Sequence, residues 1–114
     1  MKFMLLVHHN ETAFATTSEA ERERMLTESV QLTHQLHAVG QYLSASSLNP
    51  ASIATIVRVS DGPFIETEEQ IAGYFLVEAK DLDDAIDIAG RVPGARIGTV
   101  EIRPLIEITG LPAN

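Results

Sequence analysis

The stretch KFMLLVH, residues 2–8, decides much of the fold, because it is apolar on both sides of an extended backbone. Successive side chains of a β-strand point to opposite faces of the sheet. The two faces of this strand carry Phe3, Leu5 and Val7 on one side and Met4, Leu6 and His8 on the other. We therefore expect a strand that is covered on both faces.

Two amphipathic helices are predicted downstream of this strand. The first begins at Ser18, where Glu21 three residues later completes a capping box, and it ends at Gly40. The second begins at the N-cap Asp81, and acidic residues follow in its first turn, where the helix dipole favours them. The predicted inward stripes are Met25, Ser29, Leu32, Leu36 and Val39 on the first helix, and Leu82, Ala85, Ile86 and Ala89 on the second.

The remaining strands are predicted from β-branched residues and turn signals. They are expected at residues 41–48 (a short strand or extended arm), 53–59, 73–79 and 98–107, with a loop at 10–17 and a tail at 109–114. Pro104 favours a strand end or a sheet edge for the last of them. The order β-α-β-β-α-β predicts an α+β, ferredoxin-like sheet with two helices on one face, in a single domain of residues 1–114.

The second sheet face requires a cover of its own. Residues 74–77, Tyr-Phe-Leu-Val, are also apolar on both sides. An exposed apolar patch of this size usually marks an interface, and a second copy related by two-fold symmetry can cover it. We expect a homodimer of the dimeric α+β barrel type. The alternative, that loops and residues 41–48 cover the face within one chain, stays open.

Composition limits the function classes. There are no cysteines, which excludes disulfides, thiolate catalysis and Cys-based metal sites. The net charge is −8 and the Lys and Arg residues are scattered, so we expect no direct nucleic-acid ligand. No apolar run approaches the roughly 20 residues of a membrane span, and the absence of Cys suits a cytoplasmic protein. We expect no metal, since His34 and His37 have no obvious third ligand, and no organic cofactor, since there is no Gly-rich phosphate loop.

One segment carries a family resemblance. Residues 61–69, Asp-Gly-Pro-Phe-Ile-Glu-Thr-Glu-Glu, resemble the signature of the DGPF branch of the YCII-related family. Residues 1–7, 82–85 and 98–104 are similar to further segments of that family. The resemblance implies a ferredoxin-like dimeric barrel with a cleft beside the sheet. It also implies a His–Asp pair in members that are enzymes, and for some DGPF members an association with extracytoplasmic-function sigma factors.

Two positions and one stretch depart from the family pattern. Ser29 stands where the family has a helix His, eleven residues before Gly40. Glu68 stands where the signature has Lys, and the stretch before Asp61 is shorter than usual. A hydroxyl cannot replace imidazole as a base near pH 7, so these departures weaken the transfer of any activity.

The candidate site combines the resemblance with the strand pattern. Asp61 and His8 are the candidate catalytic residues, and Phe64, Arg103 and Ser29 are the candidate ligand contacts. Each has a structural alternative: Asp61 can bond its own turn, Ser29 its own helix, and Arg103 the neighbouring Glu101. His8 is preferred to His9 because it shares a face with Met4 and Leu6.

Two functions remain open from the sequence. One is a cofactor-independent acid–base enzyme, of lyase or hydrolase type, that acts on a small organic molecule in the barrel cleft. The other is a non-catalytic protein that binds a small ligand or regulates a partner such as a sigma factor. The absence of the helix His favours the non-catalytic function.

Overall fold

The computed structural model describes residues 1–59 and 70–113. Its centre is a four-stranded antiparallel sheet with the spatial order β2-β3-β1-β4. The strands are β1 (Lys2–His9), β2 (Tyr42–Ser47), β3 (Gln70–Glu78) and β4 (Thr99–Pro104). Read from the β4 edge, this is the 4-1-3-2 order of a ferredoxin-like sheet, and the predicted α+β class is confirmed.

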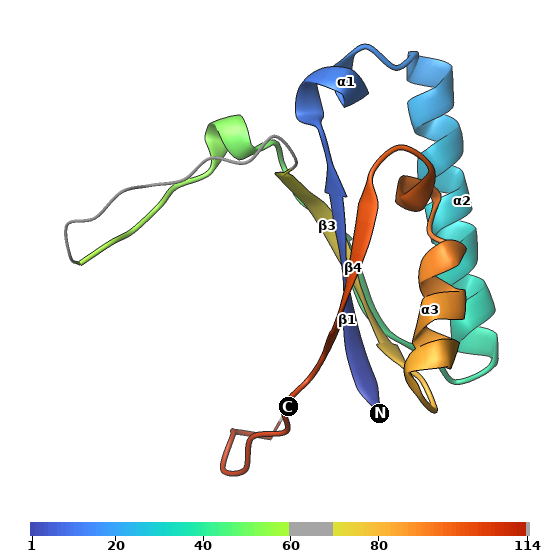
Figure 1. Ribbon diagram of the computed structural model, residues 1–114, viewed down its shortest axis with the longest axis vertical. Coiled ribbons are helices and arrows are strands. Elements are labelled where there is room, and N and C mark those ends of the chain that lie inside the picture. Colours follow the sequence, from blue (N-terminus) through green and yellow to red (C-terminus); the bar gives the residue numbers. More distant parts are fainter. Residues whose placement is uncertain (60–69, 114) are drawn as a thin grey trace.

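Two long helices, α2 (Glu19–Ala38) and α3 (Leu82–Gly90), cover one face of this sheet (Figure 1). The shorter helices are α1 (Glu11–Ala15) and the 3-10 helices η1 (Ala51–Ile53) and η2 (Pro93–Arg96). Figure 1 shows α2 and α3 side by side on the same side of the sheet. In the part of the chain that the structure describes, no helix has the length and apolar character needed to cross a membrane.

Helix ends follow the predicted local chemistry. The Ser18 hydroxyl accepts a hydrogen bond from the backbone N–H of Glu21 at 3.1 Å, and the Asp81 carboxylate accepts one from Asp84 at 2.8 Å. Both bonds satisfy N–H groups that a helix leaves free in its first turn. Gly40 follows α2 with φ of 75°, a conformation that glycine adopts without steric cost.

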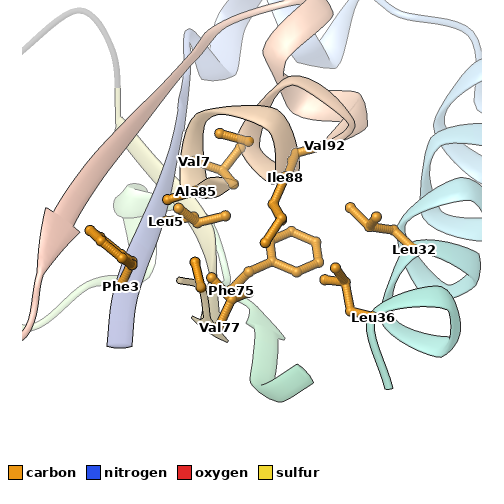
Figure 2. Close-up of a cluster of buried hydrophobic side chains, with 12 residues drawn as sticks. Phe3, Leu5, Val7, Leu32, Leu36, Phe75, Val77, Ala85, Ile88 and Val92 are labelled. Atoms are coloured by element: carbon orange, nitrogen blue, oxygen red, sulfur yellow. The ribbon is translucent and has the colours of Figure 1, made fainter. Parts of the chain in front are cut away.

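A single apolar core lies between the helices and the sheet. Figure 2 shows side chains from the strands β1 and β3 and from the helices α2 and α3 meeting there. Its main members are Phe3, Leu5, Val7, Leu32, Leu36, Phe75, Val77, Ala85, Ile88 and Val92. Burial of each large side chain contributes about 1.5–3 kcal/mol, so this layer supplies most of the stability of the monomer.

The predicted strand at residues 53–59 is wrong. Residues 51–53 form η1, and residues 54–59 are irregular and exposed, with Val59 fully accessible to solvent. The second strand of the sheet is instead β2, which pairs with β3 through Ala45 opposite Phe75. β-propensity describes how a side chain fits a half-buried surface, so residues without a strand partner gain little from it. Residues 50–59 project away from the sheet on the side opposite α2 and α3 (Figure 1).

Three smaller predictions also need correction. The expected loop at residues 10–17 contains α1, which Asn10 caps by accepting from the Ala13 N–H at 2.9 Å. Val39 is exposed because α2 ends one residue before it. On α3 the inward stripe is shifted, so the residues buried there are Ala85, Ile88 and Ala89, while Leu82 and Ile86 are exposed.

Candidate functional site

A cleft of about 590 Å³ opens on the helix-covered face, at the end of the sheet where α1 follows β1. Its walls come from α2, β2, β3, the end of β1 and the segment around η2. Pockets for small organic molecules occupy about 300–1,000 Å³ and are mainly apolar. The size and position of this cleft make it the first candidate site.

Small residues create the floor of the cleft. Further along β3 the fully buried Val77 fills the space beneath the helices, whereas the small residues Ala45, Ala72 and Gly73 leave it open beside Phe75, which also lines the cleft. A Cβ on Gly73 would lie 2.6 Å from the Ser46 carbonyl oxygen, so the approach of β2 to β3 requires glycine here.

A β-bulge interrupts the ladder at the same place. Val7 pairs with Gly73 and His8 pairs with Ile71, so Ala72 is the extra residue on β3. Bulges occur often beside binding sites because they re-aim neighbouring side chains. This one lies beside the floor of the cleft, where Ala72 and Gly73 both contribute to the lining.

The rim of the cleft is apolar and open to water. Four large aliphatic side chains at the rim are between 44% and 60% exposed, namely Leu26, Val30, Leu48 and Ile97. They come from α2, from the residue after β2 and from the residue after η2. Exposed apolar side chains that gather around a concavity mark a surface that binds an apolar molecule.

His9 is the imidazole among the described lining residues. It ends β1, and its ring stacks on Phe14 of α1 with centroids 4.5 Å apart and planes inclined by 17°. Partial burial lowers the pKa of His9 below its ordinary value of 6.5, and the nearby Glu11 carboxylate opposes this shift. The imidazole is therefore neutral near pH 7 and can accept a proton.

Ser29 lies in the wall that α2 contributes, half-buried, as its place on the predicted stripe requires. Its hydroxyl donates a hydrogen bond to the Met25 carbonyl oxygen at 2.9 Å. This is the bond to its own helix that the sequence left as the alternative to a ligand contact. The hydroxyl proton is engaged with the backbone, so Ser29 contributes shape and mild polarity to the wall.

Arg22 brings the positive charge to the cleft. Its guanidinium lies over the Phe14 ring, 5.9 Å from the centroid, and Nη1 donates to the Ala15 carbonyl oxygen at 3.4 Å. A cation over an aromatic face is attracted by the ring quadrupole. Phe14 therefore packs against both His9 and Arg22 and fixes the two polar groups of this end of the cleft.

A second polar group lies on the open face of the sheet. His8 Nε2 is 3.0 Å from one Glu101 carboxylate oxygen, and Arg103 Nη1 donates to the other at 3.3 Å. The bonds from His8 and Arg103 hold the pKa of the Glu101 carboxyl below its ordinary value. The expected pairing of Arg103 with a strand carboxylate is thus seen.

The sequence-derived site residues fall on different surfaces. His8 and Arg103 meet through Glu101 on the open face, whereas Ser29 lines the cleft on the helix-covered face. The strand backbone separates the two groups, so His8 does not share a wall with Ser29. Asp61 and Phe64 lie outside the described residues, and their contact with a ligand stays a prediction.

His9 and Arg22 were not among the sequence-derived candidates. For His9 the signal existed: it shares the alternation of Phe3, Leu5 and Val7, the face that the helices cover. The preference for His8 came from following the other face. Arg22 carried no comparable signal, because α1, which supplies Phe14 beneath it, was expected to be a loop.

His34 and His37 lie on the outer face of α2, and the described residues bring no third ligand to them. Both are exposed on α2, and they line a shallow hollow of about 370 Å³ with Thr33 and Tyr42. Across residues 1–59 and 70–113, no group of three or more His, Asp or Glu side chains is arranged to hold a metal ion.

Comparison with known proteins gives a family match over most of the chain. The sequence model of the YCII-related domain matches residues 1–109. An uncharacterised protein from Rhizobium meliloti (strain 1021) is 30% identical over an alignment that covers 92% of this chain and 92% of that protein.

Proposed function

This chain belongs to the YCII-related family, and from that premise we propose that it binds a small, mainly apolar organic molecule in the cleft on the helix-covered face. Binding without covalent chemistry is the function that the geometry supports best. We further propose that the chain is of the DGPF branch, on the motif at residues 61–64, and that it acts in the cytoplasm.

One observation carries the proposal of ligand binding. The rim residues Leu26, Val30, Leu48 and Ile97 are exposed around a hollow that is large enough for a compact organic molecule. Each apolar side chain covered by a ligand contributes through the area it removes from water, at about 25 cal/mol per Å². A rim built of charged residues would have offered no such gain.

The proposal is tested by adding a charge at the rim. Indole, a neutral aromatic probe, is titrated while the backbone amide signals of the protein are followed by NMR. We expect shifts at Ser29, Thr33 and Gly73, which line the cleft. Val30→Glu should weaken binding at least fivefold, because a carboxylate at the rim is costly to cover.

Gln35→Glu is the matched control for this variant. Gln35 is exposed on the same helix and does not line the cleft, so the added charge there should leave indole binding unchanged. Equal effects of the two substitutions, or amide shifts that avoid the cleft, would contradict the proposal.

A second candidate function is acid–base catalysis on the bound molecule. The observation that favours it is His9, a neutral imidazole with a lowered pKa inside the cleft lining. Slow turnover of a bound ligand, followed by proton NMR, should be lost in His9→Gln and should fall as the pH drops through the pKa of His9. Turnover that persists in His9→Gln would remove His9 from this role.

We also propose that the protein is a homodimer joined through the open face of the sheet. Met4, Leu6, Tyr74 and Leu76 are only partly covered on that face. Residues 50–59 project on the same side (Figure 1) and carry the exposed Ile53, Ile56, Val57 and Val59. Stable interfaces bury about 800 Å² per partner, and a sheet face with an apolar arm beside it can supply such an area.

A further inference from the structure

We infer that the molecule for which this cleft is suited is an organic anion, with a compact apolar body and one carboxylate that pairs with Arg22. The inference rests on the proposed binding in the cleft and adds the chemical class of the ligand. The apolar body lies against the rim and floor, and the carboxylate lies at the end that α1 and the start of α2 enclose.

The first argument is the charge of the lining. The chain has 16 acidic and 8 basic residues, so a surface patch taken at random would be rich in carboxylates. Among the described residues that line the cleft there is no Asp or Glu, while Arg22 supplies a positive charge and the His9 imidazole is neutral near pH 7. A cleft with one sign of charge and apolar walls concentrates ligands of the opposite sign.

The contacts of Arg22 differ from those of other arginines in this chain. Arg24, Arg91, Arg96 and Arg103 each have a carboxylate oxygen within 4 Å. Within the described part of the chain, Arg22 has no such carboxylate and contacts the Phe14 ring and one backbone carbonyl instead. Its guanidinium keeps donors free for two parallel hydrogen bonds to a carboxylate, the geometry that arginine favours.

The third argument is the position of Phe14. The ring holds the Arg22 guanidinium at its face and stacks on His9, so both polar groups stand at one end of an otherwise apolar cleft. A ligand with an apolar body and a charge at one end matches this division. A ligand that is charged at both ends, or a bare inorganic anion without an apolar body, does not.

The test compares matched acids and amides. The probes are 4-phenylbutanoate and 4-phenylbutanamide, phenylacetate and phenylacetamide, and benzoate and benzamide, each titrated at pH 7.5 with the NMR signals of the cleft as readout. Inorganic phosphate serves as an anion without an apolar body. We expect the best acid to bind about five- to tenfold more tightly than its amide, since a charge-assisted bond at a partly exposed site adds roughly one tenfold step in affinity.

Two arginine variants assign the effect to a residue. Arg22→Gln should remove the preference for the acid, so that the ratio of acid affinity to amide affinity falls to about one. Arg24→Gln is the control, because Arg24 lies two residues further along the same helix, pairs with Glu21 at 2.6 Å and does not line the cleft. It should retain the preference.

The outcomes separate this inference from the proposed function. Equal binding of acids and amides in the cleft would overturn the anion inference and leave the proposed function standing. An acid preference that survives Arg22→Gln would overturn the role of Arg22. Failure of every acid and amide to shift the cleft signals would contradict both the inference and the proposed function, whereas phosphate binding as tight as the acids would contradict the need for an apolar body.

Discussion

The two faces of the sheet are built by the same strands but differ in what covers them. On the helix-covered face, Leu5 is completely buried and belongs to a continuous core. Its neighbour Leu6 points to the open face, where it lies opposite Tyr74 on one side and Glu101 on the other and remains partly exposed. The apolar side chains of the helix-covered face are therefore buried within the monomer, whereas those of the open face stay partly exposed.

The difference explains how one strand serves two purposes. The helix-covered face is filled by large side chains at one end and leaves a cleft at the other, where the floor residues are small. The open face carries apolar residues beside the His8–Glu101–Arg103 group. We assign ligand binding to the first face and association with a second copy to the other.

The largest expected effect separates the two faces by adjacent residues. Leu5→Ala should lower the free energy of unfolding by about 2–5 kcal/mol, because it leaves a cavity in a close-packed core. Leu6→Ala should cost clearly less in dilute solution, where the monomer is favoured. Urea unfolding of both variants at low protein concentration measures the difference. Equal losses would break the comparison, since the two faces would then be equally packed within one chain.

The second prediction concerns the projecting segment. Val57 is 85% exposed, so Val57→Asp should leave the monomer fold intact. If the segment binds a second copy, the dissociation constant of the dimer should rise at least about tenfold, because a carboxylate is then buried at the interface. Sedimentation equilibrium of the wild-type chain and the variant gives the measurement.

Leu82→Asp provides the matched control for that substitution. Leu82 is exposed in the first turn of α3, on the helix side of the molecule, where an acidic residue suits the helix dipole. Its dimer constant should equal that of the wild type. A wild-type chain that is monomeric at micromolar concentration would refute the proposed dimer without affecting the cleft.

The third prediction uses the pH dependence of His9. Its pKa is lowered on folding, so the unfolded chain binds more protons as the pH falls from 6.5, its ordinary value, and the folded state loses stability. The loss begins near 6.5 and is complete below the lowered pKa; it is absent at higher pH. The groups around the imidazole are the Phe14 ring, on which it stacks, and the Glu11 carboxylate. The Arg22 guanidinium lies over the same Phe14 ring.

Between pH 7.5 and 5.5 the melting temperature of His9→Gln should therefore change less with pH than that of the wild type. The lowered pKa of Glu101 acts in a separate, more acidic range, below its ordinary value of 4.5, where protonation removes the stabilisation given by His8 and Arg103. Parallel profiles of the wild type and His9→Gln above pH 5.5 would show that the cleft does not bury this imidazole.

The smallest effect is expected at Ser29. Ser29→Ala removes one hydrogen bond to the Met25 carbonyl within the same helix and gains helix propensity, so stability should change by less than about 0.5 kcal/mol. Binding of neutral probes in the cleft should also stay the same. A large loss of binding would show that the hydroxyl contacts the ligand, against the role as wall that its hydrogen bond supports.

Much of the fold follows from local chemistry. The caps at Ser18 and Asp81 and the stop at Gly40 act within a few residues, and each lies where the sequence predicts. The last strand was expected at residues 98–107 and ends at Pro104, which cannot donate to a strand ladder. Residues 53–59 are rich in β-branched side chains, yet the structure assigns no strand to them. Strand pairing depends on segments that are distant in the sequence. The sequence pattern therefore does not decide whether residues 53–59 or residues 42–47 pair with β3.

The site was less predictable for a physical reason. The alternation of residues 2–9 separates two faces correctly but does not say which face the helices cover beside the cleft, and the preference for His8 over His9 depended on that choice. Arg22 gains its role through Phe14, which only the short helix α1 brings near it. Contacts between side chains of different helices depend on how the helices are arranged, which a local sequence pattern does not show.

The measurement that tests the division of the two faces most directly is an NMR titration of the uniformly labelled wild-type chain with 4-phenylbutanoate. We expect saturable shifts at residues of the cleft, such as Ser29, Thr33 and Gly73, with the signals of His8, Glu101 and Arg103 unmoved. Shifts centred on His8, Glu101 and Arg103, with a silent cleft, would place ligand binding on the open face and contradict it.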